Sequence, residues 1–393
     1  MLINKISKNI FIKIININYG CLIIKFPDNT KLNFGDKNSD IIGKLNIQKW
    51  SVLRKIFRSG AIGFAEAYME GKIFSEDISK VLYIMALNRN SNNQIMYGKK
   101  IYNYINLLKH KLKSNTRNIS KSNISYHYDM GNDFYSLWLD QSMTYSSALF
   151  DNEKYDLEKA QINKYKSLCE ITNITSDQSI LEVGCGWGGF AEFAAKLYGS
   201  KITGITLSKQ QAEFAKKRMY NTGLNELVEI RIVDYRDLKE KFDRIISIEM
   251  FEAVGEKYWP IFFNKLRNSL NNNGLIGMQL ITIKNELYNN YKNNSDFIQK
   301  YIFPGGFLPS ENSLNKVTYE NGLQINYKKS LAEDYAKTLS IWRKRFLENW
   351  ENMPKDPKYN NKFKKMWEYY LAYCEAGFKS NNTDVFQITL NKI

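Results

Sequence analysis

Between Ser179 and Ile283, short apolar segments alternate with longer amphipathic ones, and this alternation constrains the fold more than any other feature. The apolar segments that have strand character are Ser179–Val183, Lys201–Thr206, Leu227–Val233, Phe242–Ile248 and Leu275–Ile283. The segments with helical periodicity are Phe190–Tyr198, Lys209–Thr222 and Tyr258–Leu270. Strands and helices that alternate at this spacing form a mostly parallel sheet with helices on both faces. We therefore expect an α/β protein with a Rossmann-like sheet.

The N-terminal part of the chain has a different pattern. Apolar and polar residues alternate in Ile10–Ile17 and Cys21–Phe26, which predicts a β-meander. Helical periodicity follows in Ile47–Ser59 and again in Ala61–Leu87, and it is broken near Gly71. These patterns predict a small α+β domain over residues 1–110.

A second domain is expected over residues 126–393. The polar segment 111–125, rich in Ser, Asn and Lys, predicts a linker between the two domains. Residues 285–380 interrupt the alternation of strands and helices, because they are mainly helical in pattern and rich in aromatic residues. We expect this helical insertion to hold the substrate, and Val385–Leu390 to add a late strand.

The charge of the chain favours an anionic partner. Lys and Arg number 56 against 40 Asp and Glu, which gives a formal net charge of +16. Nucleic acid or the anionic headgroups of a membrane would be attracted by this excess. An AT-rich genome, which enriches Lys, Asn and Ile throughout, would produce the same excess without any function. Trp342–Phe346 and the lysines of 355–365 mix cations with aromatic residues, as an interfacial surface or a solvated helix face would.

The location and the metal content can also be predicted. No apolar segment approaches the ~20 residues of a membrane-spanning helix, and the N-terminus lacks the pattern of a signal peptide. The protein is expected to be cytoplasmic and associated peripherally with the inner face of the cell membrane. The two histidines and four scattered cysteines have no metal-ligand spacing, so no metal site is expected.

A glycine-rich segment, Glu182–Gly189, lies between the first strand and the first helix of the alternating region. Its Glu-x-Gly-x-Gly-x-Gly order differs from the Gly-x-Gly-x-x-Gly of nicotinamide-binding folds. Polar residues also follow the next two strands, in Thr206–Gln211 and Asp234–Asp237. Because ligands bind at the carboxyl ends of strands in such sheets, the three segments predict one cofactor site.

Five segments, read together and in order, carry a more specific signal. They are His127–Tyr135, Met143–Ser147, Glu182–Gly189, Met250–Gly255 and Tyr301–Gly306. From about Ser125 to its C-terminus the chain resembles the cyclopropane-fatty-acyl-phospholipid synthase family, which includes the mycolic acid cyclopropane synthases. The N-terminal segment resembles, more weakly, a lipid-associated domain of many bacterial members. The resemblance implies a class I methyltransferase sheet with a helical lipid-binding insertion.

The activity implied by this resemblance is transfer of the methyl or methylene group of S-adenosylmethionine to the cis double bond of an unsaturated phospholipid acyl chain. The product would be a cyclopropane fatty acid. The residues implied to bind the cofactor are Tyr145, Ser146, Glu182, Gly184, Gly186, Thr206, Gln211, Asp234 and Tyr235. Of these, the first two would cover the cofactor, the glycines would approach its methionine moiety, Thr206 and Gln211 its ribose, and the last two its adenine.

The resemblance also implies a general base, a bicarbonate ion at the floor of the acyl pocket. The residues implied to hold it are Glu252, Tyr335, Ile281, Ser147 and Gln279. Ser147 stands where many members have Cys, and Gln279 where they have His. Since Gln cannot titrate as His does, a methyl-branched or methylene product is an alternative to the ring. Cys374 matches a cysteine assigned importance in the family, although a small buried residue on a helix accounts for it equally well.

The partner implied is an anionic phospholipid membrane surface that carries unsaturated acyl chains. Nucleic acid is not expected, because the Pro-Pro dipeptide of amino-methylating nucleic-acid enzymes does not occur in the chain. A small-molecule N-methyltransferase would share the catalytic domain, and a lipid-binding module with a vestigial cofactor pocket would share the composition. The sequence leaves the oligomeric state open, a homodimer included.

Overall fold

The computed structural model describes residues 2–92, 96–98, 130–152 and 154–393. They form two compact units. The first takes the described part of Met1–Leu112 together with Asn289–Pro304 and Phe346–Asn382, and the second takes the described part of Lys113–Tyr288 together with Gly305–Arg345 and Thr383–Ile393. The predicted insertion 285–380 is therefore divided between the units, and the predicted linker 111–125 lies outside the described residues.

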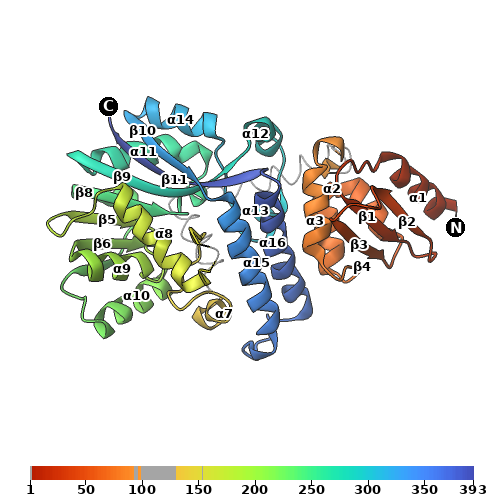
Figure 1. Ribbon diagram of the computed structural model, residues 1–393, viewed down its shortest axis with the longest axis horizontal. Coiled ribbons are helices and arrows are strands. Elements are labelled where there is room, and N and C mark those ends of the chain that lie inside the picture. The colour runs from red at the N-terminus through yellow and green to blue at the C-terminus, as the bar shows by residue number, and fades with distance from the viewer. Residues whose placement is uncertain (1, 93–95, 99–129, 153) are drawn as a thin grey trace. The chain divides into compact units, whose positions relative to one another are not determined.

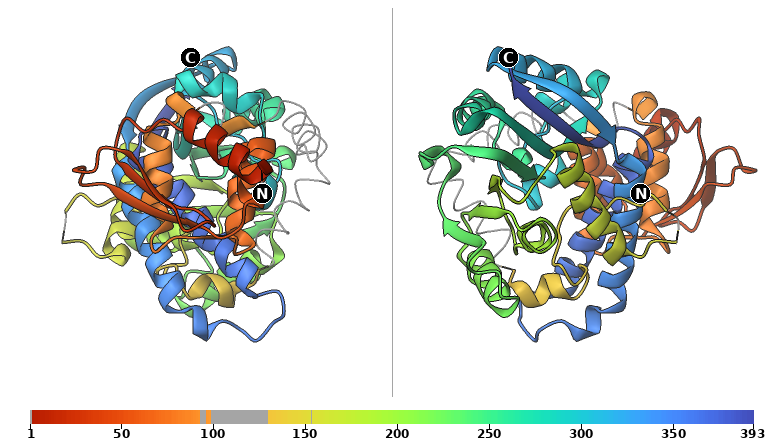
Figure 2. Two further views of the ribbon diagram at one scale, coloured as in Figure 1. Left: turned by 90° about the vertical axis from the view of Figure 1, so that its right-hand side faces the viewer. Right: turned by 60° about the vertical axis from the view of Figure 1, so that its left-hand side comes forward.

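The first unit contains a four-stranded sheet in the order β2-β1-β3-β4. Its strands are β1 (Cys21–Lys25), β2 (Lys31–Gly35), β3 (Ile42–Ile47) and β4 (Ile73–Phe74), and its first helices are α1 (Leu2–Ile14), α2 (Ser51–Met69) and α3 (Ile78–Leu87), followed by the short η1 (Asn90–Asn92). Figure 2 shows α1, β1 and β2 in red and the helices α2 and α3 in orange. Strand β1 pairs antiparallel with β2 and parallel with β3, so the predicted α+β character is present.

The prediction of a strand over Ile10–Ile17 was wrong, because most of this segment belongs to α1. The side chains of Ser7, Phe11 and Ile15 are buried, and their spacing of four residues marks one face of a helix. The run of isoleucines and lysines satisfied both periodicities over a few residues. The predicted break near Gly71 is confirmed, since Gly71 has a positive φ of 68° and follows α2, while Gly60, with a φ of 56°, kinks α2.

Helices from later in the chain complete the first unit. They include α13 (Phe297–Tyr301), η5 (Trp350–Asn352) and α16 (Asn361–Lys379). Lys300 Nζ and Tyr301 Oη both donate to Glu66 Oε1 of α2, at 2.7 and 2.8 Å. Part of the predicted helical insertion therefore packs against the N-terminal segment.

The second unit contains a seven-stranded sheet in the order β10-β11-β9-β8-β5-β6-β7. The strands are β5 (Ser179–Val183), β6 (Lys201–Thr206), β7 (Val228–Ile232), β8 (Phe242–Ile248), β9 (Leu270–Ile283), β10 (Leu323–Ser330) and β11 (Thr383–Lys392). The five strands from β5 to β9 are parallel, and β10 and β11 run antiparallel to their neighbours. Figure 1 shows β11, in dark blue, beside β9, although the two strands lie about a hundred residues apart in sequence.

Helices of this unit include α7 (Asn132–Ser136), α8 (Leu157–Ile171), α9 (Gly189–Tyr198), α10 (Lys209–Asn221), α11 (Trp259–Asn268) and α14 (Glu311–Glu320), with the short η2 (Tyr235–Asp237), η3 (Phe251–Ala253) and η4 (Glu256–Tyr258). Two further helices, α12 (Asn285–Lys292) and α15 (Ala332–Glu348), continue from it into the first unit. One core joins α8, α9 and α10 to β5, β6 and β7. The strand order reverses at β5, which creates the crevice where such sheets bind ligands. The predicted α/β class and Rossmann-like sheet are confirmed.

Strand β10 was missed, because residues 285–380 were predicted to be mainly helical. It lies at the edge of the sheet and pairs with β11 alone among the described strands. Most of its side chains are exposed, so it carries little of the apolar pattern that identifies a buried strand. Among the described residues, no helix has the length and apolarity required to cross a bilayer.

Candidate functional site

The glycine turn after β5 is shaped for close approach of a ligand. Gly184 and Gly186 have positive φ, 85° and 51°, a conformation that residues with a side chain rarely adopt. A Cβ on Gly184 would lie 2.7 Å from Cγ of Met250, whereas a Cβ on Gly186 would meet no heavy atom within 4 Å. Gly184 thus permits contact with the segment after β8, and Gly186 faces open space.

Glu182, the fourth residue of β5, carries a carboxylate oxygen without a partner. Its Oε2 is buried and accepts no hydrogen bond from the described residues. Burial raises the pKa of Glu182 to about 8, an effect that the charge of Lys164 opposes. A buried acceptor beside a glycine turn that faces open space fits a ligand with hydrogen-bond donors, such as the amino group of a methionine moiety.

The polar residues at the ends of β6 and β7 form hydrogen bonds within their own segments. Thr206 Oγ1 donates to Gln211 Oε1 at 2.9 Å, and both residues are buried. Asp234 receives two charged hydrogen bonds from Arg236, at 2.8 Å from Nε and 2.5 Å from Nη2. The ring of Tyr235 packs edge-on against Phe262. The structure therefore places these predicted cofactor residues at adjacent strand ends, and their roles stay predictions.

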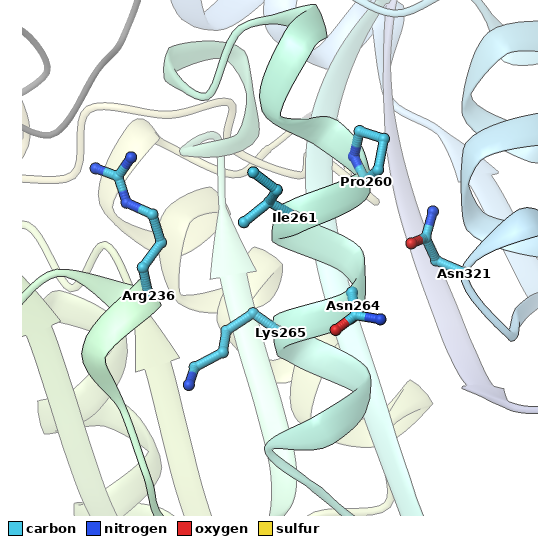
Figure 3. Close-up of a pocket in the computed structure, with 6 residues that line it drawn as sticks. All are labelled: Arg236, Pro260, Ile261, Asn264, Lys265 and Asn321. Atoms are coloured by element: carbon cyan, nitrogen blue, oxygen red, sulfur yellow. The ribbon is translucent and has the colours of Figure 1, made fainter.

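A surface depression lies beside the end of β7 (Figure 3). It is lined by Arg236, Pro260, Ile261, Asn264, Lys265 and Asn321, which come from η2, α11 and the residue after α14. Its two cations bind elsewhere in the chain, since Arg236 pairs with Asp234 and Lys265 Nζ donates to the carbonyl of Leu238. None of the six is a predicted site residue, although Arg236 bonds to Asp234, which is one.

The segment Tyr145–Ser147 lies between α7 and α8 and connects the two parts of the site. The ring of Tyr145 contacts Trp342 of α15, with centroids 5.5 Å apart. Ser146 Oγ accepts from Lys164 Nζ at 2.7 Å. The backbone N–H of Ser147 donates to Glu249 Oε1 at 2.8 Å, while the Ser147 hydroxyl donates to the carbonyl of Ala148.

Three predicted catalytic residues converge on Glu249, which the sequence did not predict. Besides Ser147, the amide of Gln279 donates to Oε1 at 2.8 Å and the hydroxyl of Tyr335 donates to Oε2 at 2.7 Å. Glu249 directly follows β8 and has a φ of 48°, an unusual conformation for a glutamate. Burial raises its pKa, and Gln279, Tyr335, Ser147 and Lys164 oppose the rise.

Glu252 lies in η3, three residues beyond Glu249, and binds differently. Its Oε1 accepts the backbone N–H of Ile281, which the resemblance assigned to the bicarbonate ion, while its buried Oε2 has no partner among the described residues. Burial, and after it the charge of Glu249, raise the pKa of Glu252 to about 8. At neutral pH the neutral acid therefore predominates at Glu252. We call Glu249, Glu252 and their four donors, Ser147, Gln279, Ile281 and Tyr335, the carboxylate cluster.

Lys164 of α8 is a second residue that sequence reasoning missed. Its side chain is fully buried. Burial lowers its pKa to about 7, against the charges of Glu249, Asp140 and Glu182. The signal was present in the sequence, because Lys164 occupies the buried stripe of α8 between Ala160 and Leu168.

Cys374 belongs to a different compact unit from the other predicted site residues. It lies half-buried on α16, in the first compact unit, whereas all the other predicted site residues lie in the second. Its predicted importance stays a prediction. Met250 links the carboxylate cluster to the glycine turn, since it lies between Glu249 and Glu252 in sequence and contacts Gly184.

The open space at Gly186 yields a test of cofactor binding. Replacing Gly186 by alanine is expected to reduce the affinity for S-adenosylmethionine at least tenfold, because the new methyl group would occupy space that the ligand needs. The positive φ should lower the free energy of unfolding by about 1 kcal/mol. Calorimetric titration and denaturant unfolding measure the two effects.

Gly223→Ala is the matched control for this change. Gly223 also has a positive φ, 69°, and its Cβ would also meet no atom within 4 Å, but it lies after α10 at the opposite end of the sheet's strands. Its alanine variant should lose similar stability and keep the wild-type affinity. Equal loss of affinity in both variants would refute cofactor binding at Gly186.

Comparison with known proteins places this site in context. The family described as mycolic acid cyclopropane synthetase matches residues 114–388. A tuberculostearic acid methyltransferase from Mycobacterium tuberculosis (strain ATCC 25618 / H37Rv) is 35% identical over 350 residues, which cover 86% of this chain and 81% of that protein. The cyclopropane-fatty-acyl-phospholipid synthase of Escherichia coli (strain K12) is 30% identical over 365 residues, covering 90% and 89%.

A solved structure extends the comparison to the cofactor. The crystal structure of a mycolic acid cyclopropane synthase complexed with SAH and CTAB is similar to this chain with a TM-score of 0.64 and 29% identity. The similarity covers 69% of this chain and 98% of that one.

Proposed function

Because this chain belongs to the mycolic acid cyclopropane synthetase family and is a methyltransferase that uses S-adenosylmethionine, we propose that it methylates the cis double bond of an unsaturated acyl chain in a membrane phospholipid. The observation that supports this proposal is the closeness of Met250, which lies between Glu249 and Glu252 in sequence, to the glycine turn at Gly184. The carboxyl group of Glu249 therefore belongs to the segment that approaches the turn where we propose that the cofactor binds.

In the proposed reaction, side chains of the protein orient the acyl chain and stabilise the charge that develops on it. S-adenosylmethionine, when bound, supplies an electrophilic methyl group. An alkene has no proton to remove before it attacks, so orientation of the acyl chain is the first requirement. The cation that remains on the acyl chain after methyl transfer is stabilised by aromatic faces. Tyr145, Trp342 and Tyr335 form such a wall, with Tyr335 lying edge-on to Trp342 and bonded to Glu249.

The product that we propose first is the cyclopropane ring, formed when the added methyl group loses a proton. A methyl-branched or methylene fatty acid is the second candidate. It is favoured by the hydrogen bond that ties Gln279 to Glu249, and by the higher identity to the tuberculostearic acid methyltransferase than to the cyclopropane synthase. The ring and a methylene or branched-alkene product need the same methyl transfer, and they differ in which bond forms as the proton leaves.

We also propose that the protein takes its substrate from an anionic membrane surface. The net charge of +16 supports this, as does α1, where Ile6 and Ile10 are exposed to 48% and 45% on a helix that also exposes Lys5 and Lys13. The interfacial surface expected around Trp342 has less support, because Trp342, Phe346 and Trp367 are fully buried.

The test uses purified protein, vesicles of a monounsaturated anionic phospholipid and S-adenosylmethionine with a labelled methyl group. Label is expected in the fatty acids, with a mass gain of one methylene and loss of the original double bond. Fragmentation of the fatty acid methyl esters distinguishes the ring from a branched alkene of equal mass. If the lipids stay unlabelled while a soluble amine acquires label, the protein is instead a small-molecule N-methyltransferase.

A further inference from the structure

We propose that Glu249 is a built-in proton acceptor and occupies the place that the resemblance assigns to a bicarbonate ion. The inference rests on the proposed methylation of an acyl double bond. It concerns the proton that leaves the acyl chain after methyl transfer, and it makes this reaction independent of an external anion.

The first argument is that the donors expected to hold bicarbonate already bind carboxylates of the chain. The backbone N–H of Ser147 and the amide of Gln279 donate to one oxygen of Glu249, each at 2.8 Å, and the Tyr335 hydroxyl donates to the other at 2.7 Å. The remaining predicted contact, the backbone N–H of Ile281, binds Glu252. Each of the four donors assigned to the anion thus serves a glutamate of the chain.

The second argument is electrostatic. A bicarbonate ion at these donors would add a negative charge to a buried region in which they already hold the carboxylate of Glu249. Two like charges that share the same donors disfavour one another strongly where water is excluded. The cation that acts on Glu249 from within the core is Lys164, and Asp140 and Glu182 also face it. The arrangement fits one built-in carboxylate and does not fit an added anion.

The third argument is the backbone at Glu249. A φ of 48° costs free energy for any residue with a side chain, and such strain persists where the surroundings determine it. Here the N–H of Glu249 donates to the carbonyl of Gln279 at 2.7 Å, which fixes the turn after β8. The turn directs the carboxylate toward Ser147, Gln279 and Tyr335, which come from three other segments of the chain.

The proton step balances without a further reactant. Methyl transfer leaves the acyl chain with one positive charge and S-adenosylhomocysteine as leaving group. Glu249 then accepts H⁺ from a C–H bond of the added methyl group and becomes a neutral carboxylic acid. The electrons of that bond form the last C–C bond of the ring or, after a hydride shift, the double bond of a methylene product. The proton returns to water after the product leaves.

The experiment compares wild type with Glu249→Gln and Glu249→Gly in buffer depleted of carbon dioxide, with and without added bicarbonate. The lipid assay described above measures turnover. Wild-type turnover should be the same in both buffers. Glu249→Gln keeps the size of the side chain but cannot accept the proton, so turnover should fall about a hundredfold or more and bicarbonate should not restore it.

The variant Glu249→Gly tests whether the three donors can bind bicarbonate once the carboxylate of Glu249 is removed. Glycine adopts a positive φ without strain, so this variant should fold, and it leaves the three donors without their carboxylate. We expect it to bind ¹³C-labelled bicarbonate, detected by NMR, and to regain at least tenfold in turnover when the ion is added. Wild type should show no such binding. Glu286→Gln, at an exposed position of α12, serves as the matched control and should behave as wild type.

Two results would overturn the inference: wild type that needs bicarbonate or binds it, or Glu249→Gln with wild-type turnover. Both differ from failure of the proposed function, in which wild type labels no lipid in either buffer. Calorimetric titration with S-adenosylmethionine provides a readout that does not depend on turnover, and Glu249→Gln should keep the wild-type affinity.

Discussion

Replacing Lys164 by methionine is expected to lower turnover at pH 7 about a hundredfold and to move the acidic limb of the pH–rate profile to higher pH. The charge of Lys164 lowers the pKa values of Glu249 and Glu182, against the effect of burial. Without that charge both pKa values rise, so a smaller fraction of Glu249 is ionised at pH 7. Because the base must be ionised, activity should recover in part as the pH increases.

The pH profile distinguishes this effect from simple damage to the fold. Methionine matches the length of lysine and suits a buried position, so the variant should remain folded and should retain binding of S-adenosylmethionine. Lys166→Met is the control, since Lys166 lies on the same helix with its side chain 56% exposed and pairs only loosely with Glu170. A Lys164→Met enzyme whose profile coincides with that of wild type would contradict an electrostatic role for this lysine.

Replacing Trp342 by alanine is expected to reduce the free energy of unfolding by about 3–5 kcal/mol, the usual cost of removing a fully buried large aromatic side chain. Trp342 is 0% exposed. Its ring contacts Trp138, Tyr145 and Tyr335, with centroid separations of 5.4 to 6.1 Å across this group. The cavity would lie beside the carboxylate cluster, so turnover should fall as well. Denaturant unfolding of the purified protein measures the change.

Trp342→Phe separates ring packing from the polar group. The indole Nε1 of Trp342 is buried and has no hydrogen-bond partner among the described residues, so its loss removes no hydrogen bond. Phenylalanine keeps most of the ring contacts, and we expect it to cost less than half as much as alanine. Equal destabilisation by both substitutions would mean that the ring contacts described above contribute little to stability.

Much of the sheet could be predicted from the sequence because its strands are buried on both faces. Strands β5, β6 and β8 occupy the predicted residues, since a short, continuous apolar segment that ends in glycine or polar residues is typical of a buried parallel strand. Helix α1 and strand β10 could not be predicted in this way. The first satisfies two periodicities over a short length, and the second has an exposed surface that leaves no apolar pattern.

The candidate site was predicted only in part, because the convergence of its residues depends on the folded sheet. The resemblance identified Ser147, Gln279 and Tyr335 but not the carboxylate that they share. Their convergence depends on the pairing of β8 with β9, which sets Ile248 beside Gln279 and so directs Glu249 toward it. Such register is a property of the folded sheet and has no local signal in the sequence. Lys164 differs, because its place on the buried face of α8 could have been noticed.

From the position of β11 we expect a limit on when the enzyme can become active during its synthesis. This strand inserts between β10 and β9, and its Gln387 donates to Oε1 of Gln279, the residue that holds Glu249. Because residues 383–392 leave the ribosome after the rest of the sheet, β9 exposes an unpaired edge until they arrive. We therefore expect the nascent chain to form the cofactor turn before it can orient Glu249.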